Sequence, residues 1–310
     1  MKKFLLALVV ILLVGVAAIY VFIPKEKSFV YSTQVKCNQE AALRYIIDKT
    51  KWQQWWPGEK KSADTYEYKG YEYKIDKILL NAVDVTVISK EDDKVGGAFR
   101  IASDTADQIK FVWNSVISFS SNPFARLVQY NKAKSIMENV DAMLNQSKFF
   151  FEKQENVYGM KITVETAKDT SLVSLTKQFD HYPSTEEVYA MEKTLAEYIA
   201  KKGAKENGNL MLHVQQISTN EYVVMIGKPV LGNVLSEGDF KIKKMVPGNI
   251  LTGEVKGGIY TIINAEQQLK NFVNDYRRIS PAIPYQSLVT NRLLEKDTSK
   301  WVTRLYYPIF

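Results

Sequence analysis

Cysteine and histidine are nearly absent from this sequence of 310 residues. It contains one cysteine, Cys37, and two histidines, His181 and His213. A single cysteine excludes an internal disulfide, a thiolate zinc site and a CxxC redox pair. The two histidines do not have the spacing of a metal site. We therefore expect no bound metal and no cofactor.

Patterns typical of nucleic-acid binding are also missing. The net charge is +7, but the basic residues occur as scattered pairs with acidic residues between them, as at 60–61 and 277–278. Neither an arginine-rich stripe nor a recognition helix is present. We expect no nucleic-acid partner, and the lack of a helix-turn-helix segment argues against direct transcriptional regulation.

The composition is that of a folded protein with a sizeable core. Hydrophobic residues make up 46% of the chain and charged residues 24%, which is typical of globular rather than disordered sequences. A chain of this length is long for a single core. It therefore predicts two domains of ordinary size.

A long apolar run lies near the N-terminus. After two lysines, residues 4–23 form 20 apolar positions without a charge, enough for a helix of about 30 Å that crosses a bilayer core. A cleaved signal peptide is the alternative, because Val16 and Ala18 satisfy the small-residue cleavage rule. The run is longer than a typical signal core, which favours an uncleaved anchor over residues 1–24. The membrane is then a partner through residues 4–23.

The orientation of this anchor depends on a small charge difference. Two lysines precede the run and two follow it, so the lysines alone do not decide. The α-amine adds positive charge before the run, and Glu26 subtracts charge after it. We expect a single-pass membrane protein whose soluble part is extracytoplasmic.

Residues 25–158 predict a first domain of mixed structure. The alternation at 29–35 indicates a strand with one buried face. Asn38 can cap a helix that runs into the tryptophan-rich segment 52–58. A long helix with one apolar side is expected from about 122 to 151. Between these helices we expect strands at 67–74, 77–89, 97–102 and 108–118.

This order of elements resembles the polyketide cyclase/START-like (SRPBCC) superfamily. The resemblance rests on the aromatic cluster at 52–56, on Trp113, and on the segment Asn122-Pro123-Phe124-Ala125-Arg126. It implies a helix-grip domain, in which a curved antiparallel sheet holds the long helix, often with an apolar cavity between them. Trp52 and Trp113 are the predicted ligand-binding residues, and packing in the core is the alternative. No catalytic constellation is visible in this half.

The second half, residues 159–310, contains an internal duplication. Residues 161–228 and 241–308 both predict the order strand, helix, strand, strand. Ser184 and Glu187 form a capping box for the first helix, and the second helix is expected to begin at Asn264. Two copies of one unit usually pack about a pseudo-two-fold axis, so a pocket is expected between them.

The duplicated unit resembles the GyrI-like domain, the effector-binding module found beside AraC-type and MerR-type DNA-binding domains. The resemblance implies an aromatic-lined pocket between the two repeats that accepts hydrophobic, often cationic, small molecules. The segments that carry it are Tyr182-Pro183, Gly227-Lys228-Pro229-Val230, Met245-Val246-Pro247-Gly248, Gly257-Gly258-Ile259-Tyr260, and the closing strand from Asp297-Thr298-Ser299-Lys300-Trp301 through Tyr306-Tyr307-Pro308-Ile309.

One position departs from the family pattern. The family places a glutamate two residues before a tyrosine on the strand after the second helix, where this sequence has Gln286 and Leu288. Glutamine cannot pair with a cation as a carboxylate does, and it cannot act as a general base. His213 could be a polar pocket group, a substitute base, or a hydrogen-bonded histidine on a sheet. We predict no catalytic residues, and ligand-binding roles for Met211, His213, Met225, Tyr260, Gln286, Leu288, Trp301 and Tyr306.

Taken together, the sequence predicts an α+β protein with an N-terminal transmembrane helix, a helix-grip domain and a duplicated βαββ domain. The function expected first is non-catalytic binding of a hydrophobic small molecule, as a sensor, carrier or sequestering protein at the membrane. The alternative is a hydrolase or detoxifying enzyme that acts on a small electrophile in the second domain. A third possibility is an interaction module whose pockets are filled by side chains.

Overall fold

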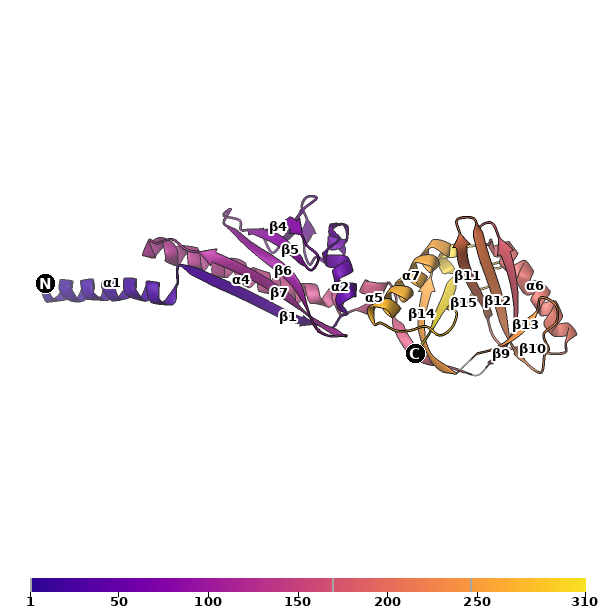
Figure 1. Ribbon diagram of the computed structural model, residues 1–310. Coiled ribbons are helices and arrows are strands. Elements are labelled where there is room, and N and C mark those ends of the chain that lie inside the picture. Colours follow the sequence, from indigo (N-terminus) through magenta and orange to yellow (C-terminus); the bar gives the residue numbers. More distant parts are fainter. Residues whose placement is uncertain (1, 169, 246) are drawn as a thin grey trace. The chain divides into compact units, whose positions relative to one another are not determined.

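The structure of the protein is a computed structural model that describes residues 2–168, 170–245 and 247–310. The chain divides into two compact units, Met1–Lys153 and Gln154–Phe310. The fold is mixed α+β, with an apolar N-terminal helix and curled antiparallel sheets (Figure 1), as the sequence predicts. Met1 of the predicted anchor and Val246 of the predicted second-repeat opening lie outside the described residues.

The N-terminal helix α1 (Lys2–Phe22) is long and apolar enough to cross a membrane, with a mean hydropathy of 3.1. A signal sequence would have the same properties, so the helix alone does not separate the two interpretations. Its C-terminal end contacts the rest of unit 1. The Tyr20 hydroxyl donates to the Ser121 carbonyl at 2.7 Å, and the Arg126 guanidinium donates to the Ile23 carbonyl at 3.1 Å.

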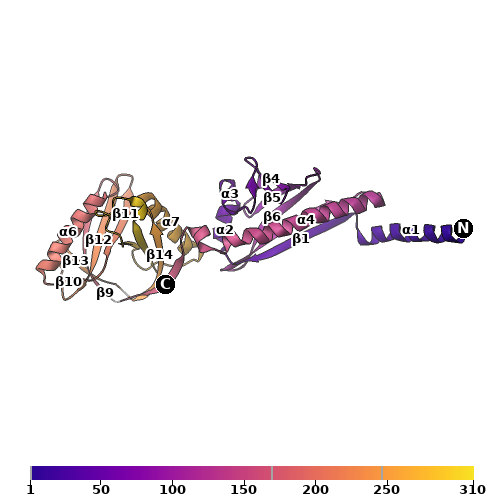
Figure 2. The same ribbon diagram turned by 180° about the vertical axis from the view of Figure 1, so that it is seen from behind.

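Unit 1 is built on an antiparallel sheet in the order β1-β7-β6-β5-β4-β3-β2. The predicted long helix is present as α4 (Pro123–Phe151). The side chain of Asn122 caps its N-terminus, and the helix packs on β1 (Figure 2). The strands are β1 (Glu26–Val35), β2 (Glu59–Lys60), β3 (Thr65–Tyr68), β4 (Tyr71–Ile78), β5 (Ala82–Ile88), β6 (Lys94–Thr105) and β7 (Gln108–Ser118).

The structure corrects the predicted helix that was to run into the tryptophan cluster. Helix α2 (Gln39–Ile46) ends before Asp48, whose carboxylate accepts from the Thr50 backbone N–H and begins a separate 3-10 turn, Lys49–Lys51. The tryptophans then form the short helix α3 (Trp52–Trp55). A local side-chain acceptor competes with helix continuation at this point.

A second correction concerns the strand predicted at 67–74. The structure has two strands there, β3 and β4, which pair with each other as a hairpin. Lys69 and Gly70 join them, with φ values of 49° and 81°. Tight hairpins require positive φ at both turn positions, and glycine adopts it without a steric penalty.

The core of unit 1 is aromatic. Trp52 stacks on Trp56 with ring centroids 5.7 Å apart, and Trp56 meets Tyr73 edge-on at 4.9 Å. The Trp113 indole donates to Ser115 Oγ at 2.8 Å and lies against the backbone at Gly97. Burial of such rings dominates the stability of a domain of this size.

This packing predicts the effect of adding one methyl group at position 97. A Cβ there would lie 2.4 Å from two atoms of the Trp113 ring and 2.5 Å from Ser115 Oγ. Gly97→Ala should destabilise unit 1 by about 1–3 kcal/mol through overpacking, measured by denaturant unfolding. Gly96→Ala is the matched control, because nothing lies within 4 Å of its Cβ position. Equal stability of the two variants would contradict the packing described.

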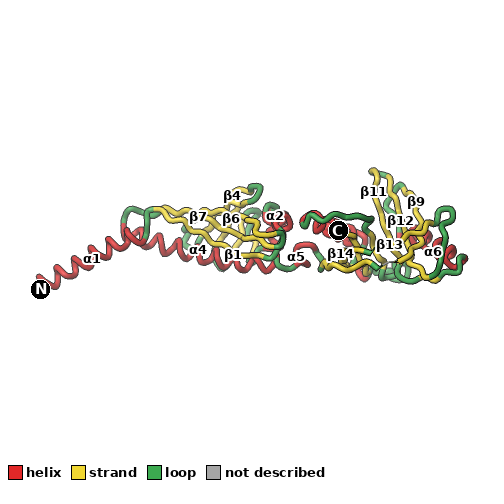
Figure 3. Tube along the Cα trace, turned by 60° about the horizontal axis from the view of Figure 1, so that its bottom comes forward, coloured by secondary structure: helices red, strands yellow, loops and turns green. Residues whose placement is uncertain are grey.

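Unit 2 contains a curled antiparallel sheet in the order β13-β9-β12-β11-β15-β16-β14-β8, with β10 paired to β12 (Figure 3). The strands are β8 (Ile162–Ala167), β9 (Thr170–Phe179), β10 (Lys205–Glu206), β11 (Leu210–Ser218), β12 (Glu221–Leu231), β13 (Lys241–Met245), β14 (Gly248–Lys256), β15 (Tyr285–Leu288) and β16 (Val302–Ile309). The short helix α5 (Gln154–Tyr158) precedes them.

The two long helices of unit 2 begin differently. The predicted capping box of Ser184 and Glu187 is present at the start of α6 (Thr185–Lys201). The predicted start of the second helix at Asn264 is wrong, because α7 runs over Ile259–Asp275. Gly258 is its N-cap and has no side chain to mark the boundary in the sequence. The helix therefore starts five residues earlier than expected.

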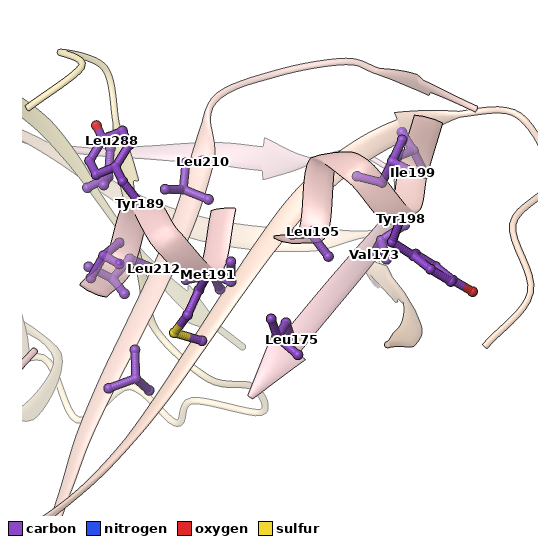
Figure 4. Packing of buried hydrophobic residues seen from close by; sticks show 14 of the residues in the cluster. Val173, Leu175, Tyr189, Met191, Leu195, Tyr198, Ile199, Leu210, Leu212 and Leu288 are labelled. Atoms are coloured by element: carbon purple, nitrogen blue, oxygen red, sulfur yellow. The ribbon is translucent and has the colours of Figure 1, made fainter. Parts of the chain in front are cut away.

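Helix α6 covers one face of the sheet. Figure 4 shows its side chains Met191 and Leu195 packed among Val173, Leu175 and Leu212 of the strands. Complete burial of one such leucine stabilises the fold by about 1.5–3 kcal/mol. Helix α7 covers β14 and β16 in the same way, through Ile262, Leu269 and Val273. The strand residues that point to the opposite face of the sheet therefore do not belong to these helix-covered cores.

Candidate functional site

Unit 2 contains a cavity of about 810 Å³. This volume is within the range of small-molecule sites in proteins. Strands from both ends of the sheet contribute to its wall. The lining consists of residues 211–213, 225–227, 243–245, 247–250, 281–283 and 308–310, with Ala167, Leu172, Ser174 and Tyr285.

The cavity lies on the sheet face that is turned away from α6. Successive side chains of a strand point to opposite faces. On β11, Leu210 and Leu212 belong to the core under α6, so Met211 and His213 point to the other side. Met225 follows the same rule on β12, where the neighbouring residues are in that core. One face of the sheet is therefore packed against α6, and the other face lines the cavity.

The cavity wall is mainly apolar, with positive charge at one edge. Methionines from three strands line it, and thioether side chains adapt to ligands of different shapes. Lys243 and Lys244 of β13 are exposed and also line it. No aspartate or glutamate of the described residues does so. The site can therefore hold an apolar molecule and interact with a negative charge.

His213 supports one wall of the cavity. Its Nδ1 lies 2.8 Å from the Pro284 carbonyl, and because a carbonyl only accepts, Nδ1 carries the proton. Burial lowers the pKa of His213, although the bond to Pro284 raises it in part. The imidazole is therefore neutral at physiological pH, and it holds in place the segment that leads to Tyr285.

The predicted ligand-binding residues of unit 2 fall into two groups. Met211, His213 and Met225 line the cavity. Tyr306 stacks on the lining residue Tyr285 with ring centroids 4.8 Å apart. The others are elsewhere: Tyr260 is 86% exposed on the first turn of α7, and Gln286, Leu288 and Trp301 are buried away from the cavity.

The predicted ligand-binding residues of unit 1 lie in its packed core. Trp52 is 1% exposed and Trp113 is 0% exposed. The Trp52 indole donates to the Ile46 carbonyl at 2.7 Å, so its polar atom is already occupied. In the described part of the chain, no group of three or more metal-ligating side chains is present.

Gln286 belongs to a buried polar cluster on the helix side of the sheet. Its Nε2 donates to Glu266 Oε1 of α7 at 3.1 Å, and its Oε1 accepts from Arg292 Nη2 at 3.3 Å. Arg292 Nη2 also donates to Thr303 Oγ1 at 2.9 Å, and the guanidinium lies 5.0 Å from the Trp301 ring centroid. The amide thus connects a buried acid to a buried base.

Burial governs the charges in this cluster. It raises the pKa of Glu266, against the smaller opposing effects of the bond from Gln286 and the charge of Arg292. Burial likewise lowers the pKa of Arg292 and raises that of Tyr182 to about 12. A partner charge within a few ångströms reduces the cost of each buried charge. The cluster fixes the position of Gln286.

Four residues that matter here were not predicted from the sequence. Lys243 and Lys244 form one of several basic pairs in the sequence. No local pattern distinguishes a basic pair beside a cavity from one on the solvated surface. Glu266 and Arg292 are far apart in the chain, and only the fold brings both to Gln286. A polar residue on the apolar side of the α7 pattern is the one signal that could have identified Glu266.

No protein-family model matches this chain, and no curated protein matches it. Three similar solved structures cover about half of it. The C-terminal domain of EcmrR is 14% identical, over 49% of this chain and 98% of that one, with a TM-score of 0.43. SAV2435 bound to tetraphenylphosphonium is 13% identical, over 49% and 94%, with a TM-score of 0.34. A hydrolase from Listeria innocua is 8% identical, over 48% and 92%, with a TM-score of 0.37.

The raised pKa of Glu266 predicts a pH-dependent contribution to stability. Between its ordinary value of 4.5 and the raised folded value, the folded protein binds more protons than the unfolded chain. This contribution is therefore present at low pH and is lost as the pH rises through the folded pKa. Glu266→Gln should show a smaller loss between pH 4.5 and neutrality in unfolding titrations. The exposed Glu186→Gln on α6 is the control, and an unchanged pH profile in Glu266→Gln would contradict the assignment.

Proposed function

We propose that this protein binds a hydrophobic small molecule, without catalysis, in the cavity of unit 2. The observation that carries this proposal is the cavity itself, which has an apolar wall and a volume of about 810 Å³. Ligand sites of proteins are concave, mainly apolar and few in number, with a small set of polar groups that orient the ligand. Met211, Met225 and Tyr285 would contact the apolar body of the ligand.

The arrangement of the sheet supports a duplicated GyrI-like architecture for residues 159–310. In one half, β9, α6, β11 and β12 follow one another in the chain, and in the other half β14, α7, β15 and β16 do so. Their order across the sheet is mirrored about the β11–β15 pair, and β13 and β8 are exchanged between the halves. We infer two copies of one unit, with the cavity on their shared face.

For residues 25–158 we retain the START-like interpretation as part of the proposal. A first strand, short helices, an antiparallel meander and a long final helix are the elements it requires, in that order. A ligand site at Trp52 and Trp113 has no such support, since both side chains fill the core. The binding function is therefore assigned to unit 2.

We further propose that α1 anchors the protein in a membrane, with residues 25–310 on the extracytoplasmic side. In cell membranes washed with sodium carbonate, the full chain should stay in the pellet and retain Met1 in N-terminal sequencing. Release into the supernatant with an N-terminus near Ala18 would instead identify a cleaved signal sequence. Protease treatment of sealed cells should degrade the body of the protein if it faces outward.

The hydrolase alternative needs a general base, and Glu266 is a candidate because burial raises the pKa of its carboxyl. Against it, Glu266 does not line the cavity and is held by Gln286. Turnover of aryl esters and epoxides by the full chain separates the two functions. Hydrolysis that is lost in Glu266→Gln would overturn the non-catalytic proposal.

Filling the cavity should abolish binding without unfolding the protein. Met211 is half-buried and points into the cavity, so Met211→Trp adds bulk where the ligand would lie. We expect 1-octanol, tested with the full chain in phosphatidylcholine nanodiscs, to shift the ¹³C-methyl signals of Met225 and Met245 in the wild type. In Met211→Trp these shifts should fall at least about tenfold at equal ligand concentration.

Ile217→Trp is the matched control for this experiment. Ile217 lies on the same strand, is 52% exposed and does not line the cavity. It should bind as the wild type does. Absence of a shift at Met225 and Met245 with every probe would overturn the proposed function.

A further inference from the structure

We propose that the ligand of this cavity is an amphiphile with one apolar chain and an anionic head, a carboxylate or a phosphate, held by Lys243, with Lys244 beside it at the edge of the cavity. This inference rests on the proposed function and gives the chemical class of the ligand. The apolar chain would lie along the methionine-lined wall, and the head would lie at the β13 edge of the cavity.

The charged side chains that line the cavity all have one sign. Of the described lining residues, those whose side chains can carry charge near neutral pH are His213, Lys243 and Lys244. The neutral state of His213 leaves the two lysines as the charged groups. Burial raises the pKa of Tyr285, and the nearby charge of Glu165 adds to this effect, but Glu165 does not line the cavity. A cationic head would meet ammonium groups with no side-chain carboxylate of the described lining residues to offset them.

These lysines differ from others of unit 2 in their partners. Lys228 has two carboxylate partners, Glu192 at 2.6 Å and Glu206 at 3.0 Å. In the described residues, neither Lys243 nor Lys244 forms an ion pair, and the Lys243 ammonium instead lies 2.9 Å from the Met225 sulfur. A thioether is a weak acceptor that does not neutralise charge. The Lys243 ammonium is thus located at the cavity wall and is available to an anion.

The contact between Lys243 and Met225 places the positively charged edge of the cavity next to its apolar wall. Met225 points into the cavity from β12, and the ammonium that contacts it comes from the edge strand β13, two strands away. An apolar chain against Met225 would therefore place its head within reach of Lys243. Hydrogen bonds between an ammonium and a carboxylate or phosphate are stronger than those between neutral groups.

The test compares ligands that share a chain and differ in the head. Octanoate, octyl phosphate, 1-octanol and octyltrimethylammonium are titrated into the full chain in phosphatidylcholine nanodiscs. The ¹³C-methyl signals of Met225 and Met245 report the cavity, and Met160, which lies against Gly253, reports unit 2 outside it. We expect the two anions to bind at least about fivefold more tightly than the alcohol, and the cation most weakly.

Glutamine variants of the lysines of β13 test where the anionic head of the ligand binds. Lys243→Gln with Lys244→Gln should weaken octanoate and octyl phosphate by at least about fivefold and leave 1-octanol unchanged. Lys241→Gln is the control, because Lys241 is on the same strand, is exposed and does not line the cavity. The anion preference should also fall as the salt concentration rises.

The results test the proposed function and the inference about the ligand head separately. Tighter binding of both anions supports the shared head chemistry, and tighter binding of one identifies it as carboxylate or phosphate. Equal affinity for all four probes, or a preference for the cation, overturns the inference but leaves the proposed function intact. An anion preference that survives the double lysine variant also overturns it. Failure of all four probes to bind overturns the proposed function and the inference together.

Discussion

The alternation of side chains along the strands of unit 2 is the constraint on which its other features depend. Leu210, Leu212, Val224 and Ile226 point to one face and form the core with α6, so that face is closed. Met211, His213 and Met225 lie between them in the sequence and must point to the other face. That face is not covered by a helix, and the curl of the sheet makes it concave. A shift of one residue in register would exchange the two sets, so the strand pairing that stabilises the fold also defines the cavity.

The same rule explains why Gln286 and Tyr285 have different surroundings although they are adjacent. Tyr285 faces the cavity and stacks on Tyr306, whereas Gln286 faces the helices and is fully buried. A glutamate at position 286 would add a second carboxylate beside Glu266, and two buried like charges at this distance would repel each other. Glutamine avoids this because it donates to Glu266 and accepts from Arg292 at once. The departure from the GyrI-like pattern is thus accounted for by the neighbours of Gln286, independently of any ligand.

Much of the fold follows from local signals in the sequence, and the site follows only in part. The Asn38 cap and the Ser184–Glu187 capping box were identified because each is a short-range pattern with one physical meaning. Boundaries were wrong where the deciding group carries little local signal, as at Gly258, or competes with a helix, as at Asp48. Met211, His213 and Met225 were predicted as ligand-binding residues, and the structure places all three in the wall of the cavity. Lys243, Glu266 and Arg292 depend on contacts between distant segments, which no local pattern encodes.

The distribution of charge in unit 2 links its stability to its proposed function. Charged groups on the helix side have local partners: Lys228 pairs with two carboxylates, and Arg292 and Glu266 each hydrogen-bond to the Gln286 amide between them. A buried charge without a partner would cost stability, so such partners are required by folding. No such requirement applies to the exposed lysines at the rim of the cavity, since water solvates them. Folding therefore does not require these lysines beside the apolar wall. Their position there favours a ligand of opposite charge.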